Sequence, residues 1–435
     1  MSTSEAPRPY GHFDDHHPPS ADRVADCVHC GFCLPTCPTY VLWGREEDSP
    51  RGRIHLVKMA LEGEAPLDHS LRQHFDSCLG CMGCLSSCPS GVQYDMIIEA
   101  TRPQLERHVP AKTSDRRFRR FVLALFPHRN RLRWAAILAW FAQKTGLQTL
   151  IRKSGVLAKL PARWRTLEAL APPVQLKKAL QGSPAPRPVK APRARVAMLE
   201  GCVQSVFFPD VNRATLAVLA AEDIEVVSVP QQGCCGALEN HAGDHAQARR
   251  RVRALIERFE TVDVDYIVVN AAGCGSALKT ADRLFAPDEL FHPRAKAFAR
   301  KVKDALELIF ELGPRAPLLP LPARVAYHDA CHLAHAQGIR EAPRALLSRI
   351  PELKLLEVPD ADVCCGSAGI YNLLHPEPAD ALGQMKADYV ASIKPDILAA
   401  ANPGCLLQIN RHLDEGIRTA HPLELIADSL KPTSG

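Results

Sequence analysis

Two short runs near the amino terminus constrain this chain most, because each spaces four cysteines in the same way. "CVHCGFCLPTCP" and "CLGCMGCLSSCP" both read Cys-x2-Cys-x2-Cys-x3-Cys-Pro. In this spacing, three thiolates on one tight loop reach three irons of a cubane, and the fourth points toward the neighbouring cluster. The runs predict two [4Fe-4S] clusters, one held by Cys27, Cys30, Cys33 and Cys88 and the other by Cys78, Cys81, Cys84 and Cys37.

The alternative for these runs is a pair of zinc sites with four cysteines each. Zinc ribbons usually take their ligands as separated Cys-x2-Cys pairs, which favours iron here. The 40 residues between the runs contain "SPRGRIHLVKMALEG", a helical pattern that begins near Pro50. We therefore expect a helix-rich two-cluster ferredoxin domain, in which shared ligands bring the clusters close enough for electron transfer.

The chain has 435 residues and 16 cysteines. Its first residues, "MSTSEAPRPYGHFDDHH", lack the basic region and apolar core of a secretory signal. No apolar run approaches the roughly 18 to 20 residues that a membrane-spanning helix requires. The sequence therefore predicts a cytoplasmic protein whose cysteines are metal ligands or redox thiols.

The second half of the chain repeats itself at an interval of about 130 residues. "RVAMLEGC" matches "RVAYHDAC", "GCCGA" matches "VCCGS", and "DYIVVNAAGC" matches "DILAAANPGC". Each copy supplies four thiols in the same order: Cys202, Cys234, Cys235 and Cys274 in the first, and Cys331, Cys364, Cys365 and Cys405 in the second.

Each copy alternates short β-branched runs such as "YIVV" and "KLLEV" with helical patterns such as "RRRVRALIERFE". This alternation predicts a parallel sheet covered by helices, with ligands at the carboxyl ends of the strands. Every cysteine group of the repeat follows a predicted strand. We expect Gly236 and Gly366 to relax a turn, so that both thiols of each adjacent pair face one site.

The chemistry of these eight thiols stays open between an iron-sulfur cluster, a zinc site and a dithiol redox centre. Buried cysteines serving only as small hydrophobic side chains would not explain why both copies keep the same four positions. We expect one or two further iron-sulfur centres here.

Each copy of the repeat contains a Cys, then a Cys-Cys-Gly and then a Gly-Cys, and the two copies follow a double ferredoxin unit. In this arrangement the chain resembles the CCG cysteine-rich domain family. That family includes heterodisulfide reductase B subunits, the anaerobic glycerol-3-phosphate dehydrogenase C subunit and the glycolate oxidase iron-sulfur subunit. "DSPRGRI", "YHDACH" and the domain order are most similar to the last of these. The resemblance implies an electron-transfer partner of FAD-binding subunits that oxidise glycolate, and often D-lactate, with a membrane acceptor.

The chain departs from heterodisulfide reductase modules at one position. Those modules end in Cys-x2-Cys and so supply a fifth thiol, whereas Ala277 and Gln408 stand here, three residues beyond Cys274 and Cys405. A five-thiolate site therefore cannot form within either copy. Four thiols still suffice for a [4Fe-4S] cluster.

Several histidines lie near the cysteine groups. His328, His332 and His335 flank Cys331, and His241 follows the first Cys-Cys pair. An imidazole there would ligate iron, shuttle a proton, or, as we expect, hydrogen-bond within a loop. His16 and His17 fall in a polar amino-terminal segment and are expected to be solvated.

Residues 101–195 hold 22 Lys or Arg against three acids, Glu106, Asp115 and Glu168, so this segment carries +19 and the remainder of the chain −14. Its Trp-bearing amphipathic stretches fit an anionic membrane surface, an acidic partner subunit, or a helical linker with a solvated cationic face. No recognition motif accompanies the charge, so we expect no nucleic-acid partner.

The sequence thus predicts an α+β multidomain chain: a flexible tail over 1–20, a ferredoxin domain over 21–100, a basic helical connector over 101–181, a Pro-rich linker over 182–194, and CCG modules over 195–318 and 319–435. The chain lacks Gly-x-Gly-x-x-Gly and Walker patterns. This agrees with what the family resemblance implies, an electron-transfer subunit that passes electrons from a partner flavin to a quinone or other acceptor. The alternatives are a thiol-disulfide reductase, a subunit of the glycerol-3-phosphate dehydrogenase type and a zinc-bearing scaffold.

Overall fold

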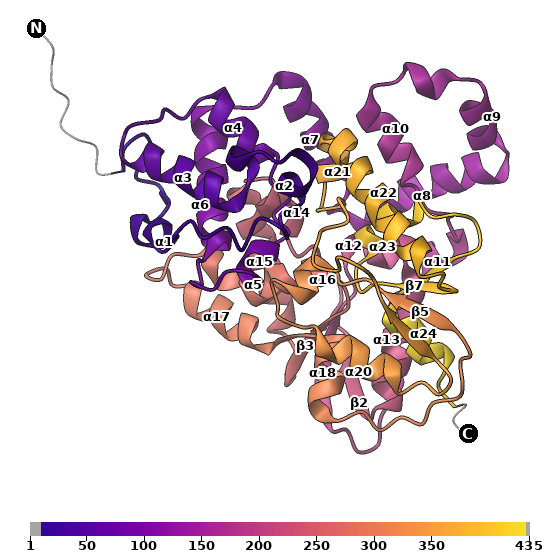
Figure 1. Ribbon diagram of the computed structural model, residues 1–435. Helices are drawn as coiled ribbons and strands as arrows, with labels where there is room; N and C mark the ends of the chain where they lie inside the picture. The colour runs from indigo at the N-terminus through magenta and orange to yellow at the C-terminus, as the bar shows by residue number, and fades with distance from the viewer. Residues whose placement is uncertain (1–9, 432–435) are drawn as a thin grey trace, which may run out of the picture.

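The structure is a computed structural model that describes residues 10–431. Figure 1 shows three parts: a helical amino-terminal domain, a set of connecting helices, and two α/β modules packed against each other. Residues 1–9 of the expected tail and residues 432–435 of the second module lie outside the described residues.

The amino-terminal domain is helical, as predicted. Ser49 caps the amino terminus of α3 by accepting from the amide of Gly52, and Pro50 occupies the first helical position, where its missing N–H costs nothing. The elements of this domain are α1 (Ala21–Ala25), α2 (Pro38–Trp43), the 3-10 helix η1 (Glu46–Asp48), α3 (Pro50–Leu61), α4 (His69–Asp76), α5 (Gly83–Ser86) and α6 (Tyr94–His108).

Residues 10–20, which the sequence assigned to a flexible tail, pack onto α3 and α6. The His12 amide donates to the Ala60 carbonyl at 3.0 Å, and Asp14 pairs with Arg107 at 2.8 Å. Phe13 is only 4% exposed. The apolar ring and the carboxylate anchor this segment, although His16 and His17 are exposed, as expected.

The basic connector is a series of helices joined by short loops, and its first helix, α6, runs across the expected boundary at residue 100. Leu132 and Ala136 of α8 pack beside Cys202 of the first module, while Phe118 of α7 packs against Ile370 of the second. The connector comprises α7 (Thr113–Leu125), α8 (Arg129–Lys144), α9 (Leu147–Lys153), η2 (Val156–Lys159), α10 (Ala162–Ala169) and α11 (Leu176–Gln181).

Each α/β module contains a four-stranded, fully parallel sheet, in the orders β2-β1-β3-β4 and β6-β5-β7-β8. This confirms the predicted fold class. The first module comprises β1 (Ala194–Leu199), α12 (Cys202–Phe207), α13 (Pro209–Ala221), β2 (Ile224–Val227), α14 (Ala237–His241), α15 (His245–Phe259), β3 (Tyr266–Val269), α16 (Ala272–Lys279), η3 (Ala281–Leu284), α17 (His292–Lys301), β4 (Val302–Asp304) and α18 (Ala305–Leu312). The second comprises β5 (Arg324–Tyr327), α19 (Cys331–Ala334), α20 (Glu341–Ser348), β6 (Lys354–Glu357), α21 (Tyr371–Leu374), α22 (Pro376–Ser392), β7 (Ile397–Ala399), α23 (Pro403–Asn410), β8 (Arg418–Ala420) and α24 (Pro422–Asp428).

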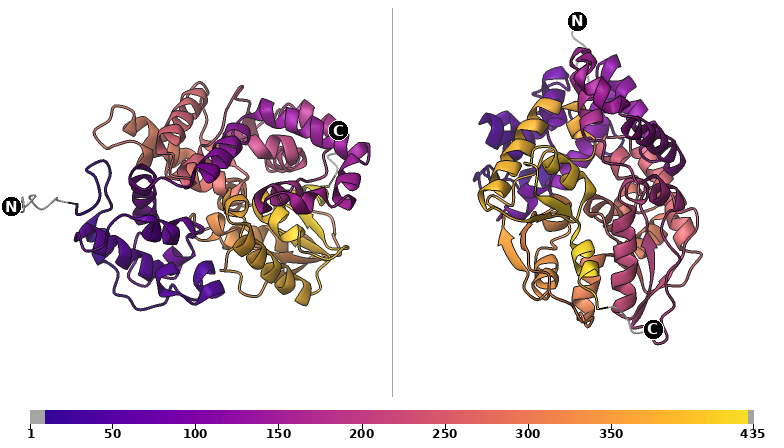
Figure 2. Two further views of the ribbon diagram at one scale, coloured as in Figure 1. Left: turned by 90° about the horizontal axis from the view of Figure 1, so that it is seen from above. Right: turned by 90° about the vertical axis from the view of Figure 1, so that its right-hand side faces the viewer.

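The two modules share one hydrophobic core. Val218 and Leu219 of α13 belong to the same buried cluster as Leu423 and Ile426 of α24. The amide of Ala272 also donates to the carbonyl of Ala401, at 3.2 Å, where the carboxyl ends of β3 and β7 meet. The two copies are thus joined at the sheet edge where their cysteines lie, and Figure 2 shows the pair side by side beneath the helical parts.

Candidate iron-sulfur and cysteine-rich sites

The first predicted set of ligands lines one small cavity at the surface of the amino-terminal domain. Its lining includes Cys27, Cys30, Cys33 and Cys88. Cys30 is exposed, and Phe32 beside it is 67% exposed. Burial raises the pKa of Cys33 to about 11. A thiol with such a pKa is neutral at pH 7 unless a cation such as iron binds it, and four convergent thiols are the donor set that a cubane requires.

The second set lines a separate, buried cavity formed by Cys37, Cys78, Cys81 and Cys84. The fourth cysteine of each run lies beside the other run, which is compatible with the predicted cross-pairing, and Cys84 lines both cavities. Tyr94 donates to the Sγ of Cys78 at 3.5 Å, and the amide of Gly80 donates to the same sulfur at 3.4 Å.

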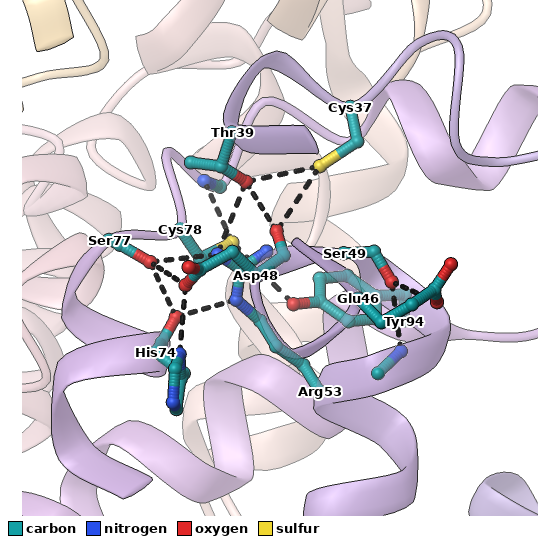
Figure 3. A network of polar contacts seen from close by, with 12 residues as sticks. Cys37, Thr39, Glu46, Asp48, Ser49, Arg53, His74, Ser77, Cys78 and Tyr94 are labelled. Atoms are coloured by element: carbon teal, nitrogen blue, oxygen red, sulfur yellow. Dashed lines mark hydrogen bonds and ion pairs between the residues drawn. The ribbon is translucent and has the colours of Figure 1, made fainter. Parts of the chain in front are cut away.

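A buried arginine lies beside this second cavity (Figure 3). The guanidinium of Arg53 donates to Ser77 at 2.8 Å and to Thr39 at 3.2 Å, and lies 3.7 Å from Asp48. Burial alone would raise the pKa of the Cys78 thiol, but the charges of Arg53 and Arg102 outweigh it and lower that pKa. A buried cation is costly unless negative charge compensates it, and a thiolate-ligated cluster supplies that charge.

In the first α/β module, the four thiols form one continuous group at the carboxyl ends of β1, β2 and β3. The Sγ atoms of Cys202 and Cys234 are 3.7 Å apart, and those of Cys235 and Cys274 are 3.2 Å apart. Cys235 also lines a cavity of about 410 Å³ between this module and α6. The lining of this cavity is cationic and includes Arg23, Arg107, Arg249 and Arg283.

In the second module, all four thiols are buried at the corresponding strand ends. The Sγ atoms of Cys331 and Cys364 are 3.9 Å apart. Cys365 and Cys405 lie with His328, their sulfur atoms and one ring nitrogen all within 4.8 Å of one another.

The glycine after each adjacent pair has the conformation that the sequence suggested. The φ angles of Gly236 and Gly366 are +74° and +88°, in the left-handed region that side chains rarely adopt. A Cβ on Gly366 would also lie 2.6 Å from the carbonyl oxygen of Ala379. In the first module, the two thiols of the pair lie beside different partners, Cys234 beside Cys202 and Cys235 beside Cys274.

The second module contacts the buried ferredoxin site directly. Cys81 belongs to one buried cluster with Cys331 and Cys364. Across the same interface, His332 donates to the carbonyl of Gly80 at 3.1 Å. The two groups of thiols are therefore neighbours, although some 250 residues separate them along the chain.

The remaining histidines of this region act in the interface, as the hydrogen-bonding interpretation expected. His335 contacts Ser86 at 2.6 Å and the carbonyl of Asp362 at 3.0 Å. His241 of the first module meets His332 of the second edge to face, with ring centroids 4.9 Å apart. Burial lowers the pKa of His332 to about 4, so this ring is neutral at pH 7. The rings of His241 and His332 therefore lie in the interface and not among the clustered cysteine thiols.

Arg53, Tyr94 and Arg102 contribute to the buried site, and the sequence analysis did not single them out. Arg102 donates to the carbonyl of Cys78 at 2.6 Å, from α6. Arg53 was within reach of prediction, since it lies in the "DSPRGRI" stretch on which the family resemblance partly rested. Nothing in the local sequence marks the other two.

Comparison with protein families matches the ferredoxin domain, much of the connector and most of each α/β module. A 4Fe-4S dicluster domain matches residues 23–92, a cysteine-rich CCG domain matches residues 196–279 and again 325–410, and the linker region of the glycolate oxidase iron-sulfur subunit matches residues 114–171. The dicluster match implies two [4Fe-4S] clusters. These matches define the chain as an iron-sulfur protein that joins a two-cluster ferredoxin domain to two CCG domains.

Comparison with individual proteins shows which family within this class the chain belongs to. The chain is 38% identical to a probable glycolate oxidase iron-sulfur subunit of Bacillus subtilis, over 94% of each chain. It is 34% identical to the glycolate oxidase iron-sulfur subunit of Escherichia coli, over 93% of this chain and 94% of the relative. The chain therefore belongs to the family of glycolate oxidase iron-sulfur subunits.

More distant matches cover less of the chain. Lactate utilization protein A of an Exiguobacterium strain is 28% identical over 54% of this chain and 98% of its own length. Among solved structures, a glutamate racemase of Bacillus anthracis aligns with a TM-score of 0.22 and 9% identity, which is too low to support an argument.

Proposed function

We propose that this chain is the electron-transfer subunit of a glycolate oxidase complex. Its four thiol groups would carry electrons from the flavin of a FAD-binding partner subunit to an acceptor. The family membership supports this role, and so does the chain's lack of a dinucleotide-binding fingerprint of its own. Oxidation of the 2-hydroxy acid belongs to the partner, and D-lactate is a second candidate substrate, since lactate utilization proteins share half of the architecture.

The observation that carries this proposal is the contact between Cys81 and the pair Cys331 and Cys364. Because this buried apolar contact joins the second ferredoxin site to the second CCG module, electrons have a direct route between them. We infer the order exposed cluster, buried cluster, second CCG centre, first CCG centre. The exposed position of Cys30 and Phe32 suits the first cluster to receive electrons from a partner.

The bound groups would supply the electron-carrying chemistry, and the protein's own residues set the conditions for it. Cys27, Cys30, Cys33 and Cys88 would hold one cubane, and Cys37, Cys78, Cys81 and Cys84 the other. Arg53 and Arg102 balance negative charge at the buried site, Tyr94 donates to its sulfur, and the surrounding apolar residues exclude water.

Cys33→Ser tests the relay in the purified complex. We expect glycolate to reduce the partner's flavin as before, while reduction of an added quinone falls to background, because the entry cluster is lost. Stopped-flow absorbance follows the flavin, and EPR follows the clusters. Equal loss of flavin reduction and acceptor reduction would contradict the relay.

Zinc without iron in an anaerobically purified sample would instead support a scaffold. Disulfide reduction by the isolated chain, driven by a reduced ferredoxin, would favour a thiol-disulfide reductase. Reduction of the clusters by glycerol 3-phosphate, and not by glycolate, would indicate the glycerol-3-phosphate dehydrogenase type.

We also propose that the connector contacts an anionic membrane, where a quinone acceptor is dissolved. None of the helices within residues 10–431 is long and apolar enough to cross a bilayer. One stripe of α8, however, exposes large apolar side chains: Trp134 is 68%, Leu138 70% and Phe141 56% exposed. The neighbouring α9 adds Leu150. A cationic surface with exposed aromatic residues is typical of segments that lie on membranes.

The charges of the connector also support a membrane contact through this surface. The three acids of the connector are already paired, Glu106 with Arg119, Asp115 with Arg163 and Glu168 with Arg152. Between Arg116 and Leu167 the sequence has no acid at all. The opposite face of α8 packs beside Cys202. Contact with a membrane through α8 would therefore bring the first CCG centre near the lipid.

Flotation with vesicles tests this contact. We expect the wild-type protein to float with vesicles of phosphatidylglycerol and to remain behind with phosphatidylcholine alone, since each exposed cation near an anionic surface contributes about 1 kcal/mol. The double variant Trp134→Ser, Phe141→Ser should lose flotation, whereas Phe32→Ser, on the other side of the molecule, should keep it. Flotation of the double variant at the wild-type level would contradict the proposal. So would the finding that a partner subunit covers the exposed apolar side chains of α8.

A further inference from the structure

His328 differs from every other histidine near the cysteine groups. It follows directly on β5, where its amide donates to the carbonyl of Ala399 at 2.8 Å, and it is 1% exposed. One ring nitrogen lies with the Sγ atoms of Cys365 and Cys405, all three atoms within 4.8 Å of one another. Two thiols and an imidazole that converge in a buried space are a metal-ligand set.

The imidazole also has unused binding capacity. Within residues 10–431, the buried Nδ1 of His328 has no hydrogen-bond partner. A buried polar atom without a partner costs about 1–3 kcal/mol, so such atoms normally have a role. Within the same range, the Nδ1 of His332 is also without a partner, but the ring of His332 contacts Gly80 and is not part of the group formed by His328, Cys365 and Cys405. His335, by contrast, uses both of its ring nitrogens in hydrogen bonds.

The position that supplies a fifth thiol in heterodisulfide reductase modules is not available for a ligand here. Gln408 is fully buried, donates to the carbonyl of Ala379 at 2.8 Å and accepts from Asn372 at 3.0 Å. Its amide is therefore engaged by α21 and α22. His328 offers the second module a fifth donor from a different strand end.

The first module has no such donor at the corresponding position. The repeat aligns "RVAMLEGC" with "RVAYHDAC", which sets Leu199 at the place of His328. Leu199 is a buried core residue at the end of β1 and has no atom that binds metal. Nitrogen ligation is therefore open to the second copy and closed to the first at this position.

We propose that the second CCG module holds an iron-sulfur centre ligated by its four cysteines together with the imidazole of His328, whereas the first module has Leu199 at the matching position and so lacks this ligand. This inference rests on the proposed electron-transfer function. A neutral imidazole adds no negative charge, and replacement of thiolate by histidine raises the reduction potential of an iron-sulfur centre. The second centre is then the more easily reduced of the pair, and it is the one in contact with Cys81.

The test detects nitrogen bound to iron. The full chain is purified anaerobically from cells supplied with ¹⁵N-histidine, reduced in steps, and measured by pulsed EPR. We expect one signal to show strong nitrogen coupling that changes from the ¹⁴N to the ¹⁵N pattern with the label. His328→Leu, which installs the residue of the first module, and His328→Cys should both abolish this coupling, while His335→Gln should keep it.

His328→Cys also guards against misfolding, because it can restore a ligand: we expect the iron content to match the wild type while the nitrogen coupling is gone. Coupling that persists in His328→Leu would overturn the proposal. A nitrogen coupling as weak as that of a hydrogen-bonded imidazole would also overturn it. The same holds if the second module contains zinc without iron, or if the iron count is unchanged when Cys364 and Cys365 are replaced by serine.

Failure of this inference is distinguishable from failure of the relay. If acceptor reduction depends on the cysteines as proposed but labelled histidine shows no coupling, the relay stands and the ligand is wrong. If coupling is found but electrons do not reach the second module, the ligand stands and the relay is wrong.

Discussion

The first and second CCG modules carry the same four thiols in the same order, yet they meet different neighbours. The thiols of the second module are all buried, and two of them pack against Cys81 of the ferredoxin domain. In the first module, Cys202 and Cys274 are half-buried, Cys202 packs beside α8, and Cys235 lines a cationic cavity. The same set of thiols therefore lies in two different surroundings. In the proposed relay, the second module would receive electrons from the ferredoxin domain and the first would pass them to the acceptor.

The largest expected effect comes from removing a thiol of each module in turn. In a glycolate-reduced complex, Cys331→Ser should leave the first centre oxidised, whereas Cys202→Ser should leave the second centre reducible. Both should slow acceptor reduction by more than the roughly 10–100-fold typical of losing a group that only supports a ligand. Freeze-quench EPR distinguishes the two centres.

If the first centre is reduced at the wild-type rate in Cys331→Ser, the proposed difference between the two modules is wrong. It would mean that the ferredoxin domain reaches the first module without the second.

A smaller difference is expected when the glycine behind each adjacent pair is replaced by alanine. Left-handed backbone costs a residue with a side chain about 1–3 kcal/mol. Gly366→Ala adds a clash at 2.6 Å with the Ala379 carbonyl, whereas the closest approach at Gly236 is 3.1 Å, to the Ala248 carbonyl. Gly366→Ala should therefore lower the free energy of unfolding by about 3 kcal/mol, and Gly236→Ala by about 1 kcal/mol.

Urea unfolding of the anaerobic protein, followed by circular dichroism, measures both variants. Equal midpoints would show that the two turns are held equally tightly, and the second site would then be no more constrained than the first.

The smallest effect concerns a carboxyl group beside the first module. Glu99 lines the same cavity as Cys235, and burial raises its pKa to about 7 from 4.5. A folded-state pKa above the unfolded value means that the protein loses stability as the pH rises from about 4.5 through 7. Glu99→Gln does not titrate, so it should be more stable than the wild type at pH 8 by about 1–2 kcal/mol, with the gap closing toward pH 5.

The pH dependence of the urea midpoint measures this change, with the exposed Glu62→Gln as a matched control that should follow the wild type. A gap that is constant from pH 5 to pH 8 would show that Glu99 does not titrate in this range. The cavity of the first module would then lack the proton-binding group that distinguishes it.

Much of the fold could be predicted because its signals are local. The strand run "YIVV" is β3 itself, and the helix expected near Pro50 is α3, Pro50–Leu61. The parallel sheets followed from the alternation of such runs. The flexible tail was drawn too long, because Phe13 and Asp14 find partners on α3 and α6 that are distant in sequence. The domain boundary at residue 100 fell inside α6 for a similar reason, since no residue there interrupts the helix.

Some residues of the candidate sites could likewise be predicted from the sequence, and others could not. The grouping of Cys27, Cys30 and Cys33 could be inferred from spacing, because a tight loop leaves little freedom in where its thiols point, and Cys88 was added from the ligand pattern of two-cluster ferredoxins. Arg102 and Tyr94 could not, since a single arginine or tyrosine on a helix carries no local mark of its partner. Among the flanking histidines, sequence treated His328 and His332 alike, and only their three-dimensional surroundings separate them.

The sequence by itself determined the number of thiol groups, their order, and the strand ends at which they lie, because covalent spacing and hydrophobic periodicity act over short stretches of chain. The tertiary structure alone decided which group touches which, how deeply each is buried, and which imidazole joins a thiol group. Those properties depend on how whole domains pack, and packing brings together residues such as Cys81 and Cys331 whose separation along the chain gives no sign of contact.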